Sequence, residues 1–416
     1  DEKIHRIRRP QPEQIDIEAA AEIIKHAKKP LIIAGGGVFY SHATEELQQF
    51  AEVHQVPVIE TIAGRTCLTW DHPLNCGPIG PTGSDSANTL AAEADVVIAI
   101  GTRLQDFVTG SWSAFRNDEM RLIAINTCRF DAHKHRALPI IADAQATITP
   151  LTSSLGDYQA DTAWVTKASD ERAAWLAIVE SRTEATDTSM PSYAQVIGQV
   201  NKLAAENDRV VTAAGGLPAE LNMNWQARSK GNFDIEFGFS CMGYEVAGGW
   251  GASMACPDDD VIVLVGDGSY LIMNSDIYSS VLTGHKMIVV VCDNAGFAVI
   301  NKLQNNTGND SFNNLLQDCT TVRKDAELPR VDFAKHAESL GAHAEKVGHL
   351  NDFAGAFERA KAADRTAVIV VDIDGTKWSS VDSWWEVGLP EVSDKPSVQA
   401  AMAEWDEGRK NQRRGV

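Results

Sequence analysis

An aspartate and an asparagine, each at the end of an apolar run, are the residues of this sequence best placed to do chemistry. The apolar residues 261–265 lead into Gly-Asp-Gly-Ser at 266–269, and the apolar residues 287–292 lead into the pair Asp-Asn. The helix-like stretch between the two runs predicts a β-α-β unit with parallel strands. Because parallel strands end on the same edge of a sheet, Asp267 and Asn294 are expected side by side at that edge.

Side chains of these two types suit a divalent metal that carries a phosphate group. Carboxylate and amide oxygens are the hard ligands that Mg2+ prefers, and Mg2+ takes few protein ligands beside phosphate oxygens. Gly268 lets the backbone approach a phosphate, and the N-terminus of the following helix supplies amide N–H groups. The segment therefore predicts a diphosphate bound through a divalent metal. The simpler alternative is a strand-to-helix turn at Gly268 with Asn294 as a helix cap.

Gly-Asp-Gly with a closing asparagine resembles the signature of the thiamine diphosphate enzymes of the acetolactate synthase type. The resemblance implies thiamine diphosphate and Mg2+ as cofactors. It implies that Asp267, Asn294 and the carbonyl of Gly296 bind Mg2+, and that Gly268 and Ser269 contact the cofactor.

A second segment, residues 239–244, is similar to the Gly-Thr-Met-Gly-aromatic segment of the same family. The resemblance implies that Met242 wedges between the two cofactor rings, and that Ser240 and Met242 bind the aminopyrimidine through their backbones. A flexible methionine suits such an irregular gap. The family also touches the diphosphate with Gln and His side chains after an earlier strand; here Gly216 and Leu217 stand at those positions, which leaves only backbone groups.

Residues 298–303 are helix-like and are followed by a polar stretch, residues 304–309, that predicts a mobile lid or a plain surface loop. The family covers its substrate with elements from this region. The resemblance therefore implies Phe297 and Gln304 as substrate-side residues.

The elements that position these residues are predicted by alternating apolar runs and amphipathic segments, which indicate an α/β fold with two doubly wound parallel sheets. The predicted strands of the first half are residues 31–34, 57–60, 95–100, 121–126 and 138–142. The predicted strands of the second half are residues 209–212, 261–265, 287–292 and 366–371. The expected organisation is a middle Rossmann-like domain (1–156), a connecting segment (157–190), a thiamine diphosphate and Mg-binding domain (191–375) and a C-terminal extension (376–416).

Composition narrows the class of protein. A chain of 416 residues favours two domains, and a formal net charge of −20 argues against nucleic acid and anionic membrane surfaces as partners. The seven cysteines include no Cys-x-x-Cys pair, and several lie in apolar segments. These features predict a soluble, cytoplasmic protein with buried, reduced thiols. The run Gly35-Gly36-Gly37 is a weak nucleotide signal because it does not form G-x-G-x-x-G.

Within the family, the fuller resemblance is to the carbon–carbon bond hydrolases of inositol catabolism. It rests on four segments, residues 34–44, 237–248, 292–308 and 382–388. The resemblance implies ring opening of a cyclic trihydroxy-dione to 5-deoxyglucuronate. Asp293-Asn294, where relatives usually carry Asn-Asn, weighs against a pyruvate-using synthase or decarboxylase. A third reading is a non-catalytic module that retained a diphosphate site.

No residue of this sequence is assigned a catalytic role. Enzymes of this type need a glutamate on an N-terminal pyrimidine-binding domain, and the sequence begins at what resembles the middle domain. The resemblance therefore implies half of a site that is shared between subunits of a homodimer or homotetramer. The chain alone is expected to be inactive.

Overall fold

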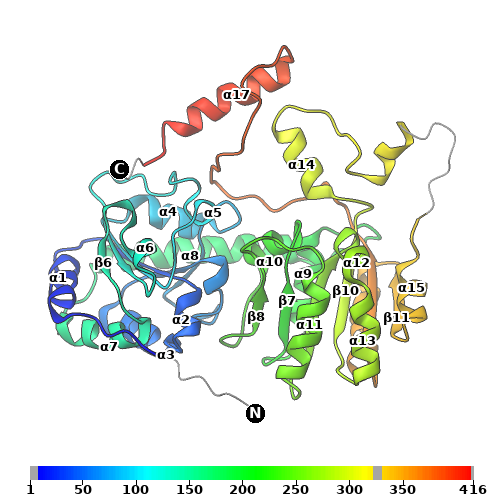
Figure 1. Ribbon diagram of the computed structural model, residues 1–416, viewed down its shortest axis with the longest axis horizontal. Coiled ribbons are helices and arrows are strands. Elements are labelled where there is room, and N and C mark those ends of the chain that lie inside the picture. The colour runs from blue at the N-terminus through cyan, green and yellow to red at the C-terminus, as the bar shows by residue number, and fades with distance from the viewer. Residues whose placement is uncertain (1–7, 322–329, 414–416) are drawn as a thin grey trace. The chain divides into compact units, whose positions relative to one another are not determined.

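The computed structural model describes residues 8–321 and 330–413, and the chain forms two compact units (Figure 1). The first unit holds the chain up to Leu176, Val381–Glu386 and the chain from Gly408 onward; the second holds Ala177–Ser380 and Val387–Glu407. No helix in the described ranges is both long enough and apolar enough to span a membrane.

The first unit is built on a parallel sheet of six strands in the order β3-β2-β1-β4-β5-β6. The strands are β1 (Pro30–Ala34), β2 (Val58–Glu60), β3 (Asn75–Pro78), β4 (Val96–Ile100), β5 (Arg121–Ile125) and β6 (Leu138–Ile140). Its helices are α1 (Gln14–Lys25), α2 (Gly36–Tyr40), α3 (Thr44–His54), η1 (Ile62–Gly64), α4 (Asp85–Glu93), α5 (Asp106–Thr109), α6 (Arg129–Ala132), η2 (Lys134–Arg136) and α7 (Ala144–Leu155). Alternate strand side chains enter two separate apolar cores, one on each face of the sheet.

The glycine run after β1 has a packing role. A Cβ on Gly35 would lie 2.5 Å from the carbonyl oxygen of Gly101, and a Cβ on Gly37 would lie 2.6 Å from its Cα. Both distances are shorter than real Cβ contacts, so the ends of β1 and β4 approach closely only because these residues are glycines.

The second unit has its own parallel sheet, in the order β11-β12-β10-β9-β7-β8. The strands are β7 (Arg209–Thr212), β8 (Phe233–Ile235), β9 (Val261–Gly266), β10 (Ile288–Asp293), β11 (His343–Val347) and β12 (Ala367–Asp372). Two parallel six-stranded sheets flanked by helices confirm the predicted α/β class.

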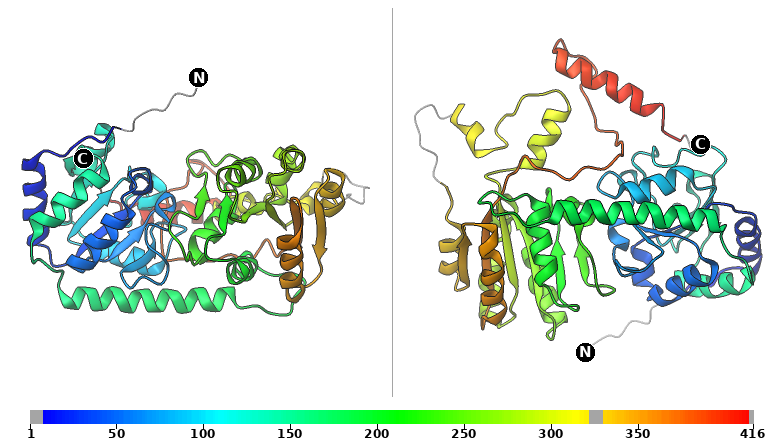
Figure 2. Two further views of the ribbon diagram at one scale, coloured as in Figure 1. Left: turned by 90° about the horizontal axis from the view of Figure 1, so that it is seen from below. Right: turned by 180° about the vertical axis from the view of Figure 1, so that it is seen from behind.

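Helices cover both faces of the second sheet. The helices are α9 (Tyr193–Leu203), α10 (Leu217–Asn224), α11 (Tyr244–Ala255), α12 (Asp267–Met273), α13 (Ser275–Thr283), α14 (Ala298–Asn306), η3 (Leu316–Thr321), α15 (Phe333–Ser339), η4 (Leu350–Asp352) and α16 (Phe353–Ala362). One core contains residues of α9, α10 and α16, and the other contains residues of α11, α12, α13 and α15. Figure 1 shows α11 and α13 in front of the sheet, and the rear view in Figure 2 shows α16 (orange) on the opposite face.

Two further helices, α8 (Thr162–Thr183) and α17 (Pro396–Arg409), have residues in both units. Within the first unit, Trp164 of α8 is buried and its Nε1 donates to the carbonyl of Pro30 at 2.8 Å. This contact anchors the first part of α8 on β1.

Several expectations need correction. The helix expected between the two apolar runs is confirmed as α13, and a further short helix, α12, begins before it at Asp267. The polar residues 304–306, expected to begin a mobile lid or a plain surface loop, belong to α14. Strands β3, β8 and β11 were not predicted. The expectation of buried thiols is wrong for Cys128 and Cys241, which are exposed.

Candidate functional site

The carboxyl ends of β9 and β10 bring the two predicted metal ligands to one edge of the sheet. The strands are parallel and in register, with Cys292 opposite Gly266. Asp267 follows as the first residue of α12, and Asn294 follows the end of β10. The backbone N–H of Gly296 donates to Oδ2 of Asp267 at 2.8 Å, so the two loops are joined directly.

Two buried oxygens at this edge lack the partners that buried polar atoms normally have. Asp267 is 6% exposed, and Asn294 is half-buried. Oδ1 of Asp267 and Oδ1 of Asn294 both have no hydrogen-bond partner among the described residues. Because a buried oxygen without a donor is costly, the pair is suited to a cation. A carboxylate and an amide oxygen fit Mg2+ in type.

The environment of Asp267 disfavours the ionised form of its carboxyl group. Burial, and then repulsion from Asp293, raises the pKa of Asp267 to about 7, and hydrogen bonds from Gly296 and Gly268 oppose this rise only in part. Asp293 itself is paired, because Nη2 of Arg330 lies 2.7 Å from its Oδ2 and the N–H of Ala295 donates to its Oδ1. Asp267 is therefore the carboxylate that a divalent cation would neutralise.

A tyrosine of α9, which packs on the other face of the sheet from α12, holds the side chain of Asn294. Its Nδ2 donates to the hydroxyl oxygen of Tyr193 at 2.6 Å. Tyr193 begins α9, is 2% exposed, and packs its ring 5.2 Å from that of Trp378. This contact fixes the amide so that its Oδ1 remains available.

Two glycines of the predicted cofactor loops lie under aromatic rings. A Cβ on Gly268 would lie 2.6 Å from the ring of Phe297, and a Cβ on Gly216 would lie 2.4 Å from the ring of Trp378. Phe297 is 43% exposed, so its ring covers Gly268 without being held inside a core. The predicted substrate residue Phe297 thus lies against the predicted phosphate loop.

The loop with Ser240 and Met242 contacts the loop with Ser269. The backbone N–H of Gly243 donates to Oγ of Ser269 at 2.7 Å. Ser240 is exposed and has a left-handed backbone (φ 56°), and Met242 is half-buried. The structure therefore brings the two sequence segments together, through Gly243.

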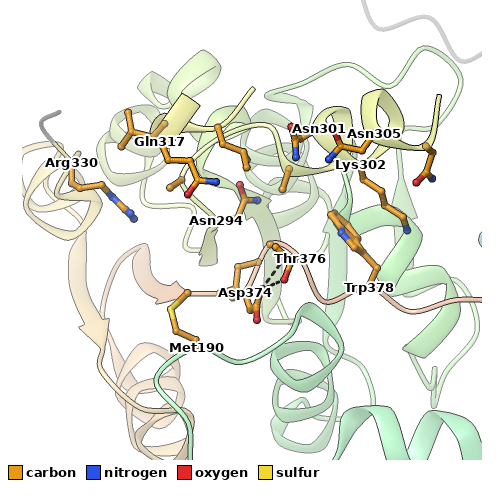
Figure 3. A pocket seen from close by; sticks show the side chains of 17 residues that line it. Met190, Asn294, Asn301, Lys302, Asn305, Gln317, Arg330, Asp374, Thr376 and Trp378 are labelled. Atoms are coloured by element: carbon orange, nitrogen blue, oxygen red, sulfur yellow. Dashed lines mark hydrogen bonds between the residues drawn. The ribbon is translucent and has the colours of Figure 1, made fainter. Parts of the chain in front are cut away.

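A pocket of about 770 Å3 opens beside Asn294 (Figure 3). Its polar lining is rich in amides and also includes a hydroxyl, charged groups and an indole: Asn294, Asn301, Lys302, Asn305, Asn306, Gln317, Arg330, Asp374, Thr376 and Trp378. Nζ of Lys302 stands 4.9 Å from the centre of the Trp378 ring. The predicted residue Gln304 does not line this pocket, and its side-chain oxygen accepts a hydrogen bond from Asn314.

Sequence reasoning missed Tyr193, every polar residue that lines the pocket except Asn294, and Glu245, whose buried carboxyl accepts a hydrogen bond from Ser269. Glu245 alone carried a signal, as a single acidic residue inside a run of small and apolar residues. The described ranges contain no group of three or more His, Cys, Asp or Glu side chains that could hold a metal ion by themselves. The candidate site thus depends on the amide of Asn294.

Each of the two units matches a domain of known proteins. Residues 17–151 match the central domain of thiamine pyrophosphate enzymes, and residues 213–371 match their C-terminal TPP-binding domain.

Relatives of known name match nearly the whole chain. The 3D-(3,5/4)-trihydroxycyclohexane-1,2-dione hydrolase of Bacillus cereus (strain AH820) is 37% identical over 426 residues, which cover 96% of this chain and 66% of the relative. The protein of the same name from Geobacillus thermodenitrificans (strain NG80-2) is 36% identical over 434 residues, which cover 98% of this chain and 67% of the relative. From these matches, the chain belongs to the family of thiamine pyrophosphate enzymes.

Proposed function

We propose that this chain binds the cofactor of a thiamine diphosphate-dependent hydrolase that opens 3D-(3,5/4)-trihydroxycyclohexane-1,2-dione to 5-deoxyglucuronate. The observation that carries the proposal is the pair of buried oxygens, on Asp267 and Asn294, in a chain of this family. The substrate in this proposal is taken from the name of the relatives. The chain spans 66% of the length of the Bacillus cereus relative, so the activity is a proposal and is not assigned to this chain alone.

The proposed roles follow from where the loops lie. Asp267, Asn294 and the carbonyl of Gly296 would hold Mg2+, while Gly268 and Ser269 would contact the diphosphate. Thiamine diphosphate supplies the electron sink for carbon–carbon bond cleavage. The protein's share is to bind and orient the cofactor and the substrate, with water as the second reactant of the hydrolysis.

Ser240 and Met242 are assigned to the ring end of the cofactor. Support comes from the contact of their loop with Ser269, through the N–H of Gly243. A half-buried Met242 is free to pack against a bound ring.

The pocket beside Asn294 is the proposed chamber for the polyhydroxylated ring. Amide side chains both donate and accept, so Asn301, Asn305 and Gln317 suit a ring that carries hydroxyls and carbonyls. The indole of Trp378 offers an apolar face for the ring carbons.

We also propose a cytoplasmic homo-oligomer, a dimer or tetramer, with the site shared between subunits. Five large apolar side chains are 39–66% exposed on α12 and α13, directly after the proposed phosphate loop: Leu271, Ile272, Met273, Tyr278 and Leu282. Such a patch favours association. Sedimentation should show a dimer or larger; a monomer at micromolar concentration would oppose the proposal.

The function is tested by assaying the complete gene product with thiamine diphosphate and Mg2+ on the cyclic dione and on pyruvate in parallel. Ring opening without pyruvate consumption supports the proposal. Pyruvate turnover would replace the proposed substrate, and no turnover of either would favour a non-catalytic module.

A further inference from the structure

Glu245 has a buried carboxyl that accepts hydrogen bonds from three separate segments of the chain. It lies near the start of α11 and is 0% exposed. Its Oε1 accepts from the N–H of Ala214 at 3.2 Å, and its Oε2 accepts from the N–H of Gly243 at 2.9 Å. Oγ of Ser269 lies 2.9 and 2.8 Å from the two oxygens. These three partners belong to the turn after β7, the loop before α11 and the first turn of α12.

A carboxyl in this position is costly. Among the described residues, no Lys, Arg or His lies within ion-pair distance of Glu245. Burial raises its pKa, and the donors Ser269, Ala214 and Gly243 oppose that rise. Burying a polar group without a cation is tolerated only when hydrogen bonds satisfy it, so these bonds account for its presence.

Two of the segments that Glu245 joins turn at glycines. Gly215 and Gly243 have left-handed backbones, with φ of 86° and 93°. A Cβ on Gly243 would lie 2.2 Å from the side chain of Met273, so no larger residue fits there. Glycine adopts and leaves this backbone region without strain, so contacts with other residues must select one conformation of each turn. The carboxyl oxygens of Glu245 supply such contacts, to the N–H of Ala214 beside Gly215 and to the N–H of Gly243.

We propose that Glu245 is a positioning residue that fixes the phosphate-binding loops and the ring-binding loop in one arrangement. The inference rests on the proposed cofactor site, because the joined loops are those assigned to the diphosphate (Ser269, and the backbone of the turn at Ala214) and to the cofactor rings (the loop that ends at Gly243). Glu245 does not contact the cofactor in this account. It acts through the three groups that it holds.

A glutamate meets this requirement where similar residues fail. Glutamine has the same size but replaces one acceptor oxygen by an NH2 group, which would face the N–H of either Ala214 or Gly243 donor to donor. Aspartate keeps the charge but is shorter by one methylene, so it cannot reach all three groups. Either change should leave a buried N–H donor without an acceptor. Because cofactor binding needs these segments in place, we expect the affinity for the cofactor to fall about tenfold or more.

The test compares Glu245→Gln with the matched control Glu220→Gln. Glu220 is also a buried carboxyl (1% exposed) with a raised pKa, and it accepts from the N–H and Oγ of Ser379 at 2.8 and 2.7 Å. Affinity for thiamine diphosphate with Mg2+ is measured by calorimetry, and stability by urea denaturation. We expect both variants to lose stability, but only Glu245→Gln to bind the cofactor about tenfold or more weakly.

Two further measurements separate the outcomes. Glu245→Asp should weaken binding in the same direction, and it replaces Glu245→Gln as the test if that variant does not fold. Hydrogen exchange at the amides of Ala214 and Gly243 should speed up in the Glu245 variants and not in Glu220→Gln. Unchanged cofactor affinity, or an equal loss in Glu220→Gln, would overturn the inference. Absence of binding by the unmodified protein would instead overturn the proposed cofactor site, and the inference with it.

Discussion

Replacing Asp267 by asparagine should separate two effects on stability. One is the destabilisation by the buried charge when no metal is bound, and the other is the stabilisation by Mg2+ and thiamine diphosphate. The substitution keeps an oxygen for the N–H of Gly296, which donates to Oδ2 at 2.8 Å, and removes the charge beside Asp293. Without metal the variant is expected to be more stable than the parent protein, because the buried charge has no partner cation. With thiamine diphosphate and Mg2+ it is expected to gain nothing.

The size of the effect follows from the pKa of Asp267. Burial and Asp293 raise that pKa from 3.8 to about 7. A folded pKa above the unfolded one means that the stability contributed by the neutral carboxyl is complete below pH 3.8 and is lost as the pH rises through about 7. At about pH 8 the ionised group costs the metal-free fold up to on the order of 4 kcal/mol. The asparagine of the variant is neutral at every pH and avoids this cost.

The assay is urea denaturation at about pH 8 and about pH 5, with and without the cofactor and Mg2+. At about pH 8 the metal-free Asp267→Asn protein should be more stable by on the order of 2–4 kcal/mol, and the difference should shrink at about pH 5. Ligand at about 100 times its dissociation constant should stabilise the parent protein by about 2.7 kcal/mol and leave the variant unchanged.

A matched control is Asp143→Asn in the first unit. Burial alone would raise the pKa of Asp143, but bonds from Ser41, Ala146 and Arg9 hold it below its usual value. This substitution should therefore destabilise the protein at about pH 8. The reasoning is refuted if Asp267→Asn behaves like Asp143→Asn without ligand, or if it retains the stabilisation by Mg2+ and cofactor.

Three other substitutions test the surroundings of the site. Tyr193→Phe removes the acceptor of the Asn294 amide and should weaken Mg2+ binding about threefold to tenfold, measured by titration calorimetry; unchanged binding would mean that the tyrosine does not orient the amide. Gly216→Ala would place a Cβ 2.4 Å from the ring of Trp378, so a loss of about 1–3 kcal/mol in denaturation and a changed tryptophan emission are expected. Unchanged stability and emission would show that the ring of Trp378 can move aside without cost. Phe297→Ala removes the ring that covers the proposed phosphate loop and should speed cofactor association in stopped flow with less than about 1 kcal/mol of lost stability, since the ring is 43% exposed; slower association would place the ring in the bound state.

The central strands could be predicted because their composition depends on burial alone. Strands β1, β4, β9, β10 and β12 have nearly every residue buried, and such continuous apolar runs are typical of interior parallel strands. The positions of Asp267 and Asn294 follow from these strands, because the residue after a parallel strand must lie at the carboxyl edge. The sequence alone therefore predicts that both lie at one edge, and the structure places them there.

The missed strands β3, β8 and β11 all lie at the edges of their sheets. An edge strand needs less apolar surface and often carries polar or charged residues. Strand β11 shows this with its sequence His-Ala-Glu-Lys-Val, of which only Val347 is buried. Strand β3 contains Gly77 and Pro78, which local propensity disfavours in strands, and tertiary context overrides that preference.

The missed site residues come from other elements of the second unit. Tyr193 reaches Asn294 across 101 residues of sequence, and Arg330 reaches Asp293 across 37. No periodicity or spacing in a single sequence indicates such pairings. Glu245 differs, because a carboxylate among glycine, alanine and valine already requires a partner.

The most direct test of the account is the position of the cation. Crystals grown with thiamine diphosphate and Mn2+, which replaces Mg2+ and scatters anomalously, would show where the metal binds. The account predicts one strong peak about 2.1 Å from both Oδ1 of Asp267 and Oδ1 of Asn294, with a diphosphate beside Gly268 and Ser269. A cation bound elsewhere, or a diphosphate bound without any metal at these two oxygens, would contradict it.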